Sequence, residues 1–155
     1  MWRRIQVPKE YTFFELHVAI QDVMGWYDCH LHGFRIAKNG TKMPIVIQYP
    51  SPEDDIGFGM EALDERDEHI ADYFGKAVQQ CVYEYDFGDG WEHTILFEKE
   101  LPADPQKKYP LCVAGKNACP PEDCGGVWGY ENVKTVIKNP KHPEHQSVLD
   151  WLCIE

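Results

Sequence analysis

The chain has 155 residues, 26 of them acidic and 15 basic, which gives a formal net charge of −11 at pH 7. This length suits one domain with its own hydrophobic core, so we expect residues 1–155 to form a single domain. The negative charge disfavours sequence-independent binding of nucleic acid, which needs Lys and Arg to neutralise phosphates. The N-terminal residues lack the apolar segment of a signal peptide, and no apolar run approaches the ~18 residues needed to span a bilayer. We therefore expect a cytoplasmic protein without a membrane segment.

The first predicted elements are a strand and a helix. The alternating residues RRIQVP predict a strand that ends at Pro8. The residues that follow, TFFELHVAIQDVMG, predict a helix with Thr12 as its N-cap, Glu15 completing a capping box, and Gly25 ending it. The helix carries His17, which we expect to be partly exposed or packed, with no further role.

Residues 29–49 predict a β-hairpin around an Asn39-Gly40 turn, because Asn-Gly is the strongest short-range hairpin signal. Its first strand places His30 and His32 on one face, together with two apolar side chains. The acidic stretch at residues 51–68 has no periodic pattern, and we expect a long surface loop there.

The second half of the chain predicts a short helix (EHIADYF), then two strands (QCVYEYDF and EHTILFEKEL) joined around GDG. Pairing Tyr85 with His93 keeps one face of this hairpin apolar, so we expect that register, with Gly90 in the left-handed region. It sets Asp86 opposite Glu92, and two like charges in that position call for a nearby cation.

The C-terminal third predicts a Pro-rich connection (LPADPQKKYPL), a cysteine-containing loop and two helices (GYENVKTVIKN and PEHQSVLDWL). The order of elements predicts an α+β fold. We expect an antiparallel sheet of two hairpins plus an N-terminal strand, packed against three or four helices.

Three cysteines, Cys112, Cys119 and Cys124, lie in the segment LCVAGKNACPPEDCGG. Clustered cysteines in a reducing compartment favour zinc over disulfides, and a tetrahedral site would need a fourth ligand, for which His93 is a candidate, as are His30 and His32. Unligated cysteines in a Pro-Gly loop are the alternative. Cys81 is expected in the core, and Cys153 packed on the last helix.

Further polar residues form a second candidate site. Glu122 and Asp123 precede a predicted helix, where they favour its dipole, or they serve as functional carboxylates. Asp89, Trp91 and His93 lie at or after the second hairpin turn, and we expect them to gather near the CPPED segment together with His32. The complete set of candidates outside the cysteines is His30, His32, Asp86, Asp89, Trp91, His93, Glu122 and Asp123.

Six motifs occur in one order: RRIQVP, TFFELHVAIQDVMGW, HLHGF, YEYDFGDGWEHTI, CPPEDCGG and GYENV. Together they resemble the plasmid pRiA4b ORF-3-like family over about residues 2–152. The resemblance implies membership of a biochemically uncharacterised family, some of whose members are labelled as passengers of mobile elements. A resolvase activity is not supported, since that needs a nucleophilic serine and a basic DNA-binding helix.

Two functions remain open from the sequence. The first is a small binding or regulatory module with a structural zinc in its cysteine loop, and with Trp26, Tyr85, Trp91 and Trp128 lining a groove for a protein or small-molecule partner. The second is a metal-dependent hydrolase acting on nucleic acid or phosphoesters, built on the histidines and aspartates named above. We prefer the first, because the sequence shows no nucleophile with a base and a residue to orient it.

Overall fold

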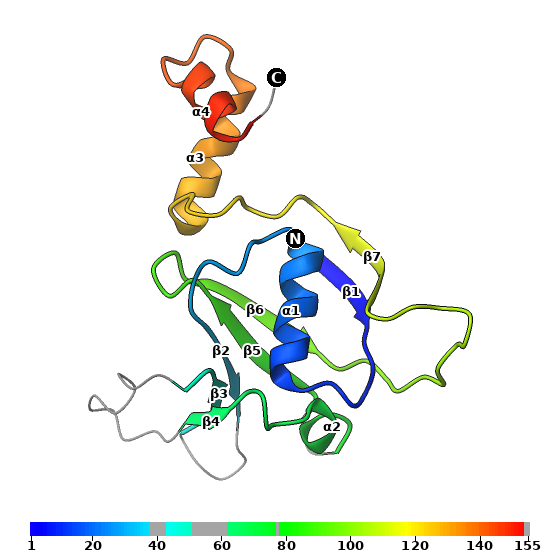
Figure 1. Cartoon of the computed structure of the whole chain (residues 1–155). Helices are drawn as coiled ribbons and strands as arrows, with labels where there is room; N and C mark the ends of the chain where they lie inside the picture. The colour runs from blue at the N-terminus through cyan, green and yellow to red at the C-terminus, as the bar shows by residue number, and fades with distance from the viewer. Residues whose placement is uncertain (38–42, 51–61, 77, 154–155) are drawn as a thin grey trace.

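The computed structural model describes residues 1–37, 43–50, 62–76 and 78–153. Within these ranges the chain forms seven strands and four helices, which confirms the α+β class (Figure 1). The strands are β1 (Trp2–Gln6), β2 (His32–Ile36), β3 (Ile45–Gln48), β4 (Ala62–Asp64), β5 (Gln80–Tyr85), β6 (Trp91–Leu96) and β7 (Leu111–Lys116). The helices are α1 (Phe13–Met24), α2 (Ile70–Tyr73), α3 (Gly126–Lys138) and α4 (His145–Trp151).

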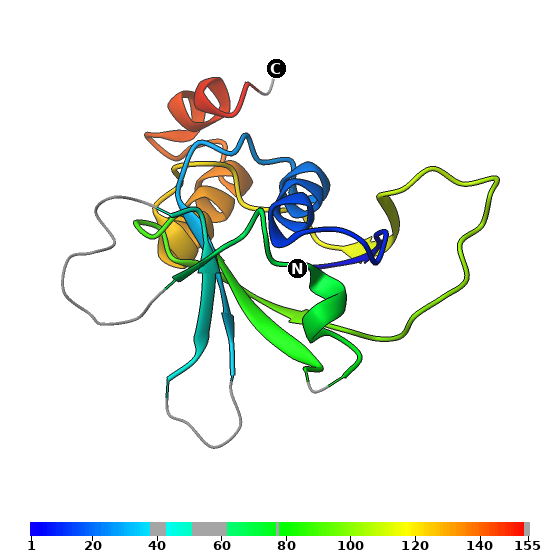
Figure 2. The same cartoon turned by 60° about the horizontal axis from the view of Figure 1, so that its bottom comes forward.

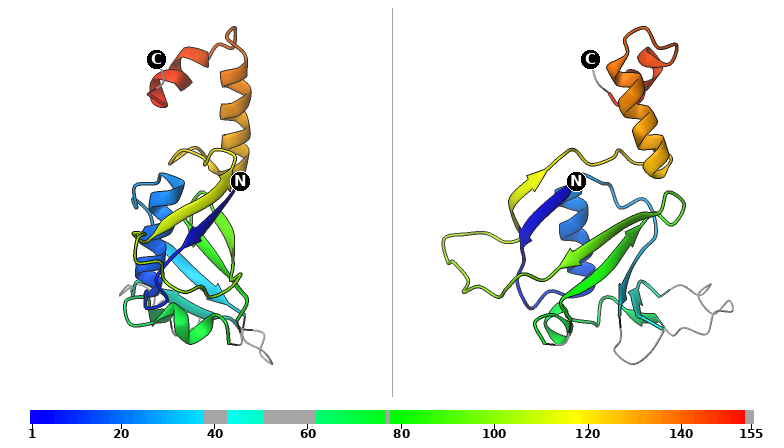
Figure 3. Two further views of the ribbon diagram at one scale, coloured as in Figure 1. Left: turned by 90° about the vertical axis from the view of Figure 1, so that its right-hand side faces the viewer. Right: turned by 180° about the vertical axis from the view of Figure 1, so that it is seen from behind.

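Five strands form the main sheet in the order β4-β3-β2-β5-β6, and α1 lies across one of its faces (Figures 1 and 3). Helix α1 begins and ends as the sequence predicts. Thr12 and Glu15 form the capping box, and Gly25 closes the helix in the left-handed conformation. Its apolar side chains, led by Phe13, pack on Phe34 and the other aromatic residues of the sheet.

The register of the second hairpin differs from the expected one. Tyr85 pairs with Trp91 and Tyr83 with His93, so each partner lies two residues earlier than expected. The loop is longer because the Asp86 carboxylate accepts hydrogen bonds from the backbone N–H groups of Gly88 and Asp89, and the Asp86 carbonyl accepts one from Gly90. Aspartate side chains commonly stabilise turns in this way, and the apolar pattern alone does not show it.

The cation expected beside two opposed acidic residues is present, but one residue of the acidic pair differs from the expected one. Glu84 rather than Asp86 lies opposite Glu92, and Arg35 of the neighbouring strand β2 forms ion pairs with both glutamates. These three charged residues lie on the sheet face opposite α1, because residues of β5 alternate between Tyr83, buried towards α1, and Glu84.

Two strand assignments correct the sequence analysis. β1 does not join the main sheet but pairs with β7 in a separate two-stranded sheet. β7 includes Cys112, which the sequence places in an irregular loop. β4 follows residues 51–61 and pairs parallel to β3, so part of the expected surface loop is a strand. The Asn39-Gly40 turn and residues 51–61 lie outside the described residues.

Helices α3 and α4 pack on each other and project from the sheet, as the side view in Figure 3 shows. Figure 2 shows that the segment between β6 and β7, which carries the Pro-rich connection, is a long loop that extends away from α1. Among the described residues, none of the helices combines the length and apolar character needed to cross a membrane.

Candidate functional site

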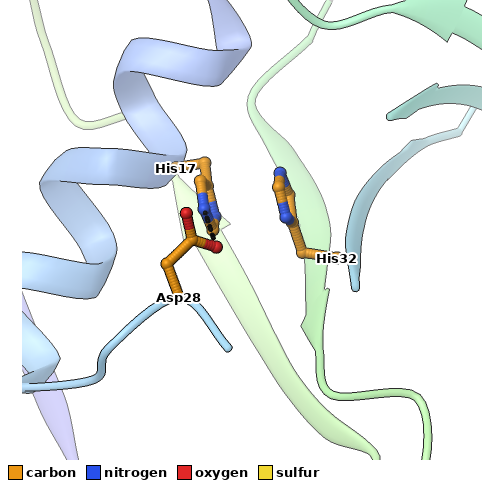
Figure 4. Close-up of side chains that lie close together, drawn as sticks. All are labelled: His17, Asp28 and His32. Carbon is orange, nitrogen blue, oxygen red and sulfur yellow. Dashed lines mark hydrogen bonds and ion pairs between the residues drawn. The ribbon is translucent and has the colours of Figure 1, made fainter. Parts of the chain in front are cut away.

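A closed ring of hydrogen bonds links α1 to β5 and to the segment that follows α1. The Asp28 backbone N–H donates to Oε1 of Gln21 (3.0 Å), and Nε2 of Gln21 donates to the Tyr83 hydroxyl (3.0 Å). That hydroxyl lies 2.9 Å from Nδ1 of His17, and Nε2 of His17 lies 2.9 Å from Asp28 (Figure 4). His17, Gln21 and Tyr83 are buried, so the ring satisfies polar groups that water does not reach.

The ring also defines the tautomer of His17. Nε2 of His17 faces the Asp28 carboxylate, which can only accept, so Nε2 carries the proton and donates it. In the neutral ring Nδ1 is then the acceptor, and the Tyr83 hydroxyl, which accepts from Gln21, donates to it. Burial lowers the pKa of His17, with the neighbouring His32 as the next cause, so this imidazole is held neutral in that tautomer.

A second pair lies beside this ring, where Nε2 of His32 donates to Glu65 over 2.7 Å. The His17 and His32 rings are stacked with their centroids 3.4 Å apart and their planes 1° from parallel. Asp28 completes a group of possible metal donors with the two histidines. Imidazole lone pairs lie in the ring plane, however, so parallel rings do not point at one ion. The stacked pair is thus a hydrogen-bonded polar core and not a metal site.

The other group of donors surrounds His30, just before β2. Nε2 of His30 lies 3.1 Å from Asp123, 3.7 Å from Asp86 and 3.9 Å from Glu122. This nitrogen is buried, yet it has no hydrogen-bond partner among the described residues. An unpaired buried nitrogen that faces three carboxylates requires an explanation.

In two of these carboxylates, one oxygen accepts hydrogen bonds from the protein and the other oxygen faces His30. Oδ1 of Asp86 accepts the two backbone hydrogen bonds of the 86–90 turn, which leaves Oδ2 facing the imidazole. Oε1 of Glu122 accepts from the Tyr85 hydroxyl (2.9 Å) and the Tyr27 backbone (2.8 Å), and Oε2 faces the imidazole. Ligands of metal sites are commonly oriented by such outer hydrogen bonds.

The segment that carries Glu122 and Asp123 is fixed on the sheet by two further hydrogen bonds. The Trp26 indole donates to the Pro120 carbonyl (2.9 Å), and the Gly125 backbone donates to the Asp89 carboxylate (3.0 Å). Asp89 therefore holds the CPPED segment against the hairpin turn. Among the candidates named from the sequence, His30, Asp86, Glu122 and Asp123 come together, with Asp89 beside them.

The remaining candidates lie elsewhere. His32 belongs to the buried pair with Glu65. His93 packs edge-on against Trp26, at 5.4 Å between ring centroids, and its Nδ1 lies 3.2 Å from the Trp91 carbonyl. Burial lowers the pKa of His93. Of the four aromatic residues expected to line a groove, Trp26, Tyr85 and Trp91 are core residues, and Trp128 is 87% exposed.

The structure does not gather the three loop cysteines. Cys112 is exposed on β7, Cys119 contacts Arg3 and the Met24 sulfur, and Cys124 is buried. Neither of the two donor groups found among the described residues contains a cysteine. The strand β7 accounts for this separation, because its pairing with β1 fixes Cys112 away from the loop. Cys81 is buried as expected, whereas Cys153 is exposed and not packed on the last helix.

Three residues of the stacked cluster were not among the candidates. His17 had a usable signal, because it lies one turn after Phe13 and one turn before Ile20 on the apolar face of α1. A histidine in that position is buried and needs polar partners. Asp28 and Glu65 had no such signal, since both lie in irregular segments whose placement depends on the assembled sheet.

The chain was compared with known proteins. Residues 1–154 match the family described as "Plasmid pRiA4b ORF-3-like protein". The uncharacterized protein y4hQ of Sinorhizobium fredii (strain NBRC 101917 / NGR234) is 34% identical over 154 residues, which cover 96% of this chain and 72% of that protein. The crystal structure of MM3350 from Methanosarcina mazei Go1, a protein of unknown function, has a TM-score of 0.84 and 42% identity, covering 97% of this chain and 80% of that one.

Proposed function

The chain belongs to the plasmid pRiA4b ORF-3-like family, and we propose that it is a binding module for a divalent cation, held by His30, Asp86, Glu122 and Asp123. The observation that carries this proposal is the buried Nε2 of His30, which lacks a hydrogen-bond partner while three carboxylate oxygens face it. The zinc that the sequence analysis expects at the cysteine loop is here proposed at a different set of residues.

The spacing of the donor atoms supports the proposal. Bonds of about 2.1 Å in a tetrahedron place ligand atoms about 3.4 Å apart. The nitrogen–oxygen distances of 3.1 to 3.9 Å around His30 bracket that value. Donor atoms of His30, Asp86 and Asp123 all lie within 4.8 Å of one another. Glu122 is outside that group and is the outermost of the four proposed ligands, 3.9 Å from the imidazole nitrogen. One imidazole and three carboxylates suit zinc or manganese, and the absence of thiolates from this set disfavours the softest ions.

A direct metal titration tests the proposal. Protein freed of metal by a chelator is titrated with Zn²⁺ and with Mn²⁺ in a calorimeter, and we expect one ion per chain for at least one of them. Asp123→Asn should weaken binding at least about tenfold, because it removes one charged ligand from a side chain that is 72% exposed. The melting temperature of the metal-free protein should not change.

A matched control separates the site from general attraction by an acidic surface. Asp72 on α2 has a similarly exposed side chain (69%), and Asp72→Asn should leave metal affinity unchanged. Absence of binding in the parent protein, or equal affinity in the parent and Asp123→Asn, would contradict the proposal.

A metal-dependent hydrolase is the second candidate, and one observation favours it. Asp123 is largely exposed, so the cluster opens to solvent on that side, whereas structural metal sites are closed by their ligands. Catalytic sites keep an open position for water, whose pKa the ion lowers. The cluster also adjoins a pocket at His30.

The hydrolase candidate is tested with bis(p-nitrophenyl) phosphate and p-nitrophenyl acetate in the presence of Zn²⁺ or Mn²⁺. We expect release of p-nitrophenol that needs both protein and metal and that falls in Asp123→Asn. A rate no higher than that of the metal ion alone would leave the binding module as the function.

A further inference from the structure

An open pocket of about 230 Å³ lies between α1, the start of β2, the ends of β3 and β4, and the 86–90 turn. We call it the histidine pocket. Its polar lining includes Asp28, His30, His32 and Glu65. Its apolar lining comes from Phe14, Leu31, Tyr49 and Phe87.

In the part of the chain that the structure describes, the histidine pocket is lined by acidic residues without basic ones to balance them. Two carboxylates, Asp28 and Glu65, lie in it, and none of the described residues that line it is a Lys or Arg. The guanidinium of Arg66 lies 4.8 Å from the Tyr49 ring, but Asp64 pairs with it directly. The carboxylates around His30 add negative charge at one side, and three of them outweigh the charge of a divalent ion bound there. The pocket therefore favours cations over anions.

The two carboxylates are held in place before any ligand arrives. Asp28 accepts from His17 and Glu65 accepts from His32, and both histidines belong to the stacked pair. The Asp28 side chain is nevertheless 51% exposed, so it remains available to a ligand. A carboxylate already oriented by the fold loses little conformational entropy when it binds.

The rim of the pocket is apolar and exposed to solvent. Phe14, Leu31, Tyr49 and Phe87 are between 40% and 65% exposed, although they are large hydrophobic residues. Ligand pockets are typically lined by apolar and aromatic side chains with a small number of placed polar groups. Three of the four are aromatic, and aromatic faces attract ammonium groups.

We propose that the histidine pocket binds a small organic ammonium ion, a primary amine carried on an apolar body of about the size of one aromatic ring. The size follows from the volume, because a cavity of about 150 Å³ holds benzene, whereas drug-sized ligands need about 300–1,000 Å³. The ammonium group binds at the exposed carboxylate of Asp28, the buried carboxylate of Glu65 adds negative charge to the pocket, and the apolar body contacts the rim. This site is separate from the proposed cation cluster, by which we mean His30, Asp86, Glu122 and Asp123, and it shares only His30 with that cluster.

Three probes of similar shape and different charge test this inference. 2-Phenylethylamine, 2-phenylethanol and 3-phenylpropionate are each titrated into the full chain near pH 7 in the presence of a chelator, with binding followed by NMR shifts. We expect the amine to bind at least about tenfold more tightly than the alcohol, and the carboxylate to bind most weakly. The chelator makes the result independent of whether the cation cluster binds a metal.

Two variants separate the charge from the rim. Asp28 has a positive φ of 54°, which Asn tolerates well, and an Asn amide oxygen can still accept from His17. Asp28→Asn should therefore weaken the amine about tenfold and leave the alcohol unchanged. Phe87→Ala should weaken the amine and the alcohol alike. Asp123→Asn, which removes a ligand of the cation cluster, is expected to leave all three affinities within about twofold.

A further probe identifies the source of the ammonium group. N-acetyl-lysine methylamide, which represents a lysyl side chain, should bind more weakly than 2-phenylethylamine if the pocket takes a free amine. Tighter binding of the lysine derivative would assign the same chemistry to a peptide and overturn the ring-sized body. Binding of 3-phenylpropionate as tight as that of the amine, equal binding of amine and alcohol, or no binding up to about 10 mM would overturn the proposal altogether.

Discussion

The buried His17 and the half-buried His93 make the stability of this protein sensitive to acid. Burial lowers the pKa of both His17 and His93 in the folded chain. In the unfolded chain both imidazoles bind a proton near an ordinary pKa of about 6.5. Because the unfolded state then binds more protons, the free energy of unfolding falls as the pH drops from about 6.5 towards the lowered values of the folded state.

This fall in stability is measurable by urea denaturation between pH 7.5 and 5.5. The slope is at most about 1.4 kcal/mol per pH unit for each histidine, and no further loss from these groups occurs below their folded pKa values. His93→Gln, at the less central of the two positions, should make the slope shallower. A slope equal to that of the parent protein would show that His93 is not held neutral by the fold.

The cysteines provide a residue-scale test of where metal binds. Burial raises the pKa of Cys81 to about 12 and that of Cys124 to about 11, whereas Cys29, Cys112 and Cys153 are exposed. Iodoacetamide near pH 8 should modify the three exposed thiols first and the two buried thiols only on unfolding, because the thiolate is the reactive form. The order in which the thiols are modified is measured by mass spectrometry of the labelled peptides.

A chelator should leave these labelling rates unchanged, since no described donor group contains a cysteine. A sharp increase in the labelling of Cys112, Cys119 and Cys124 after chelation would instead restore the zinc site expected from their spacing.

At the scale of elements, two glycines, one in the 86–90 turn and one at the start of α3, have different roles. Gly90 and Gly126 both have positive φ, 67° and 66°. A Cβ at Gly90 would meet nothing within 4 Å, whereas one at Gly126 would lie 2.7 Å from the Asp89 carbonyl oxygen. The first glycine only shapes the turn, and the second also permits the close approach of α3 to that turn.

Alanine substitutions distinguish these roles. Gly90→Ala should cost about 1 kcal/mol of unfolding free energy, the usual cost of a left-handed Ala. Gly126→Ala should cost about 3 kcal/mol or more, because a backbone carbonyl cannot rotate away as a side chain can. The two costs are compared by urea denaturation, and equal values would mean that α3 can shift away from the 86–90 turn without loss.

For the whole molecule, the C-terminal helix α4 and the proposed cation cluster are separable. All four proposed ligands precede α3, and α4, which the structure describes in full, has no buried residue; its apolar contribution comes from half-buried side chains such as Val148. Truncation after Asn139 should therefore leave the affinity for metal unchanged. It should lower the free energy of unfolding by about 2 kcal/mol, the value of the apolar surface that α4 covers.

Circular dichroism and the metal titration of the truncated chain check this expectation. Loss of metal binding in a truncated chain that keeps its β-sheet signal would show that α4 supports the cluster from a distance.

Local signals were enough to predict several elements from the sequence. The two ends of α1 were predictable from the capping box and Gly25, because the hydrogen bonds of these residues lie within the helix itself. The left-handed Gly90 and the α+β class were also predictable from turn chemistry and from the order of periodic segments. Four of the residues at the proposed cation cluster were among the candidates, because their types and motifs point to metal chemistry.

Only the tertiary structure decided which candidates meet. The register of the second hairpin depends on hydrogen bonds of the Asp86 side chain, and the separation of Cys112 depends on a strand pairing across more than a hundred residues. Glu65 reaches His32 because β4 pairs with β3, which no local pattern in the acidic stretch predicts. Side-chain caps and long-range pairings have no periodic signature, so the sequence alone could name the reactive residues but not sort them into the carboxylates around His30, a stacked polar core and a pocket.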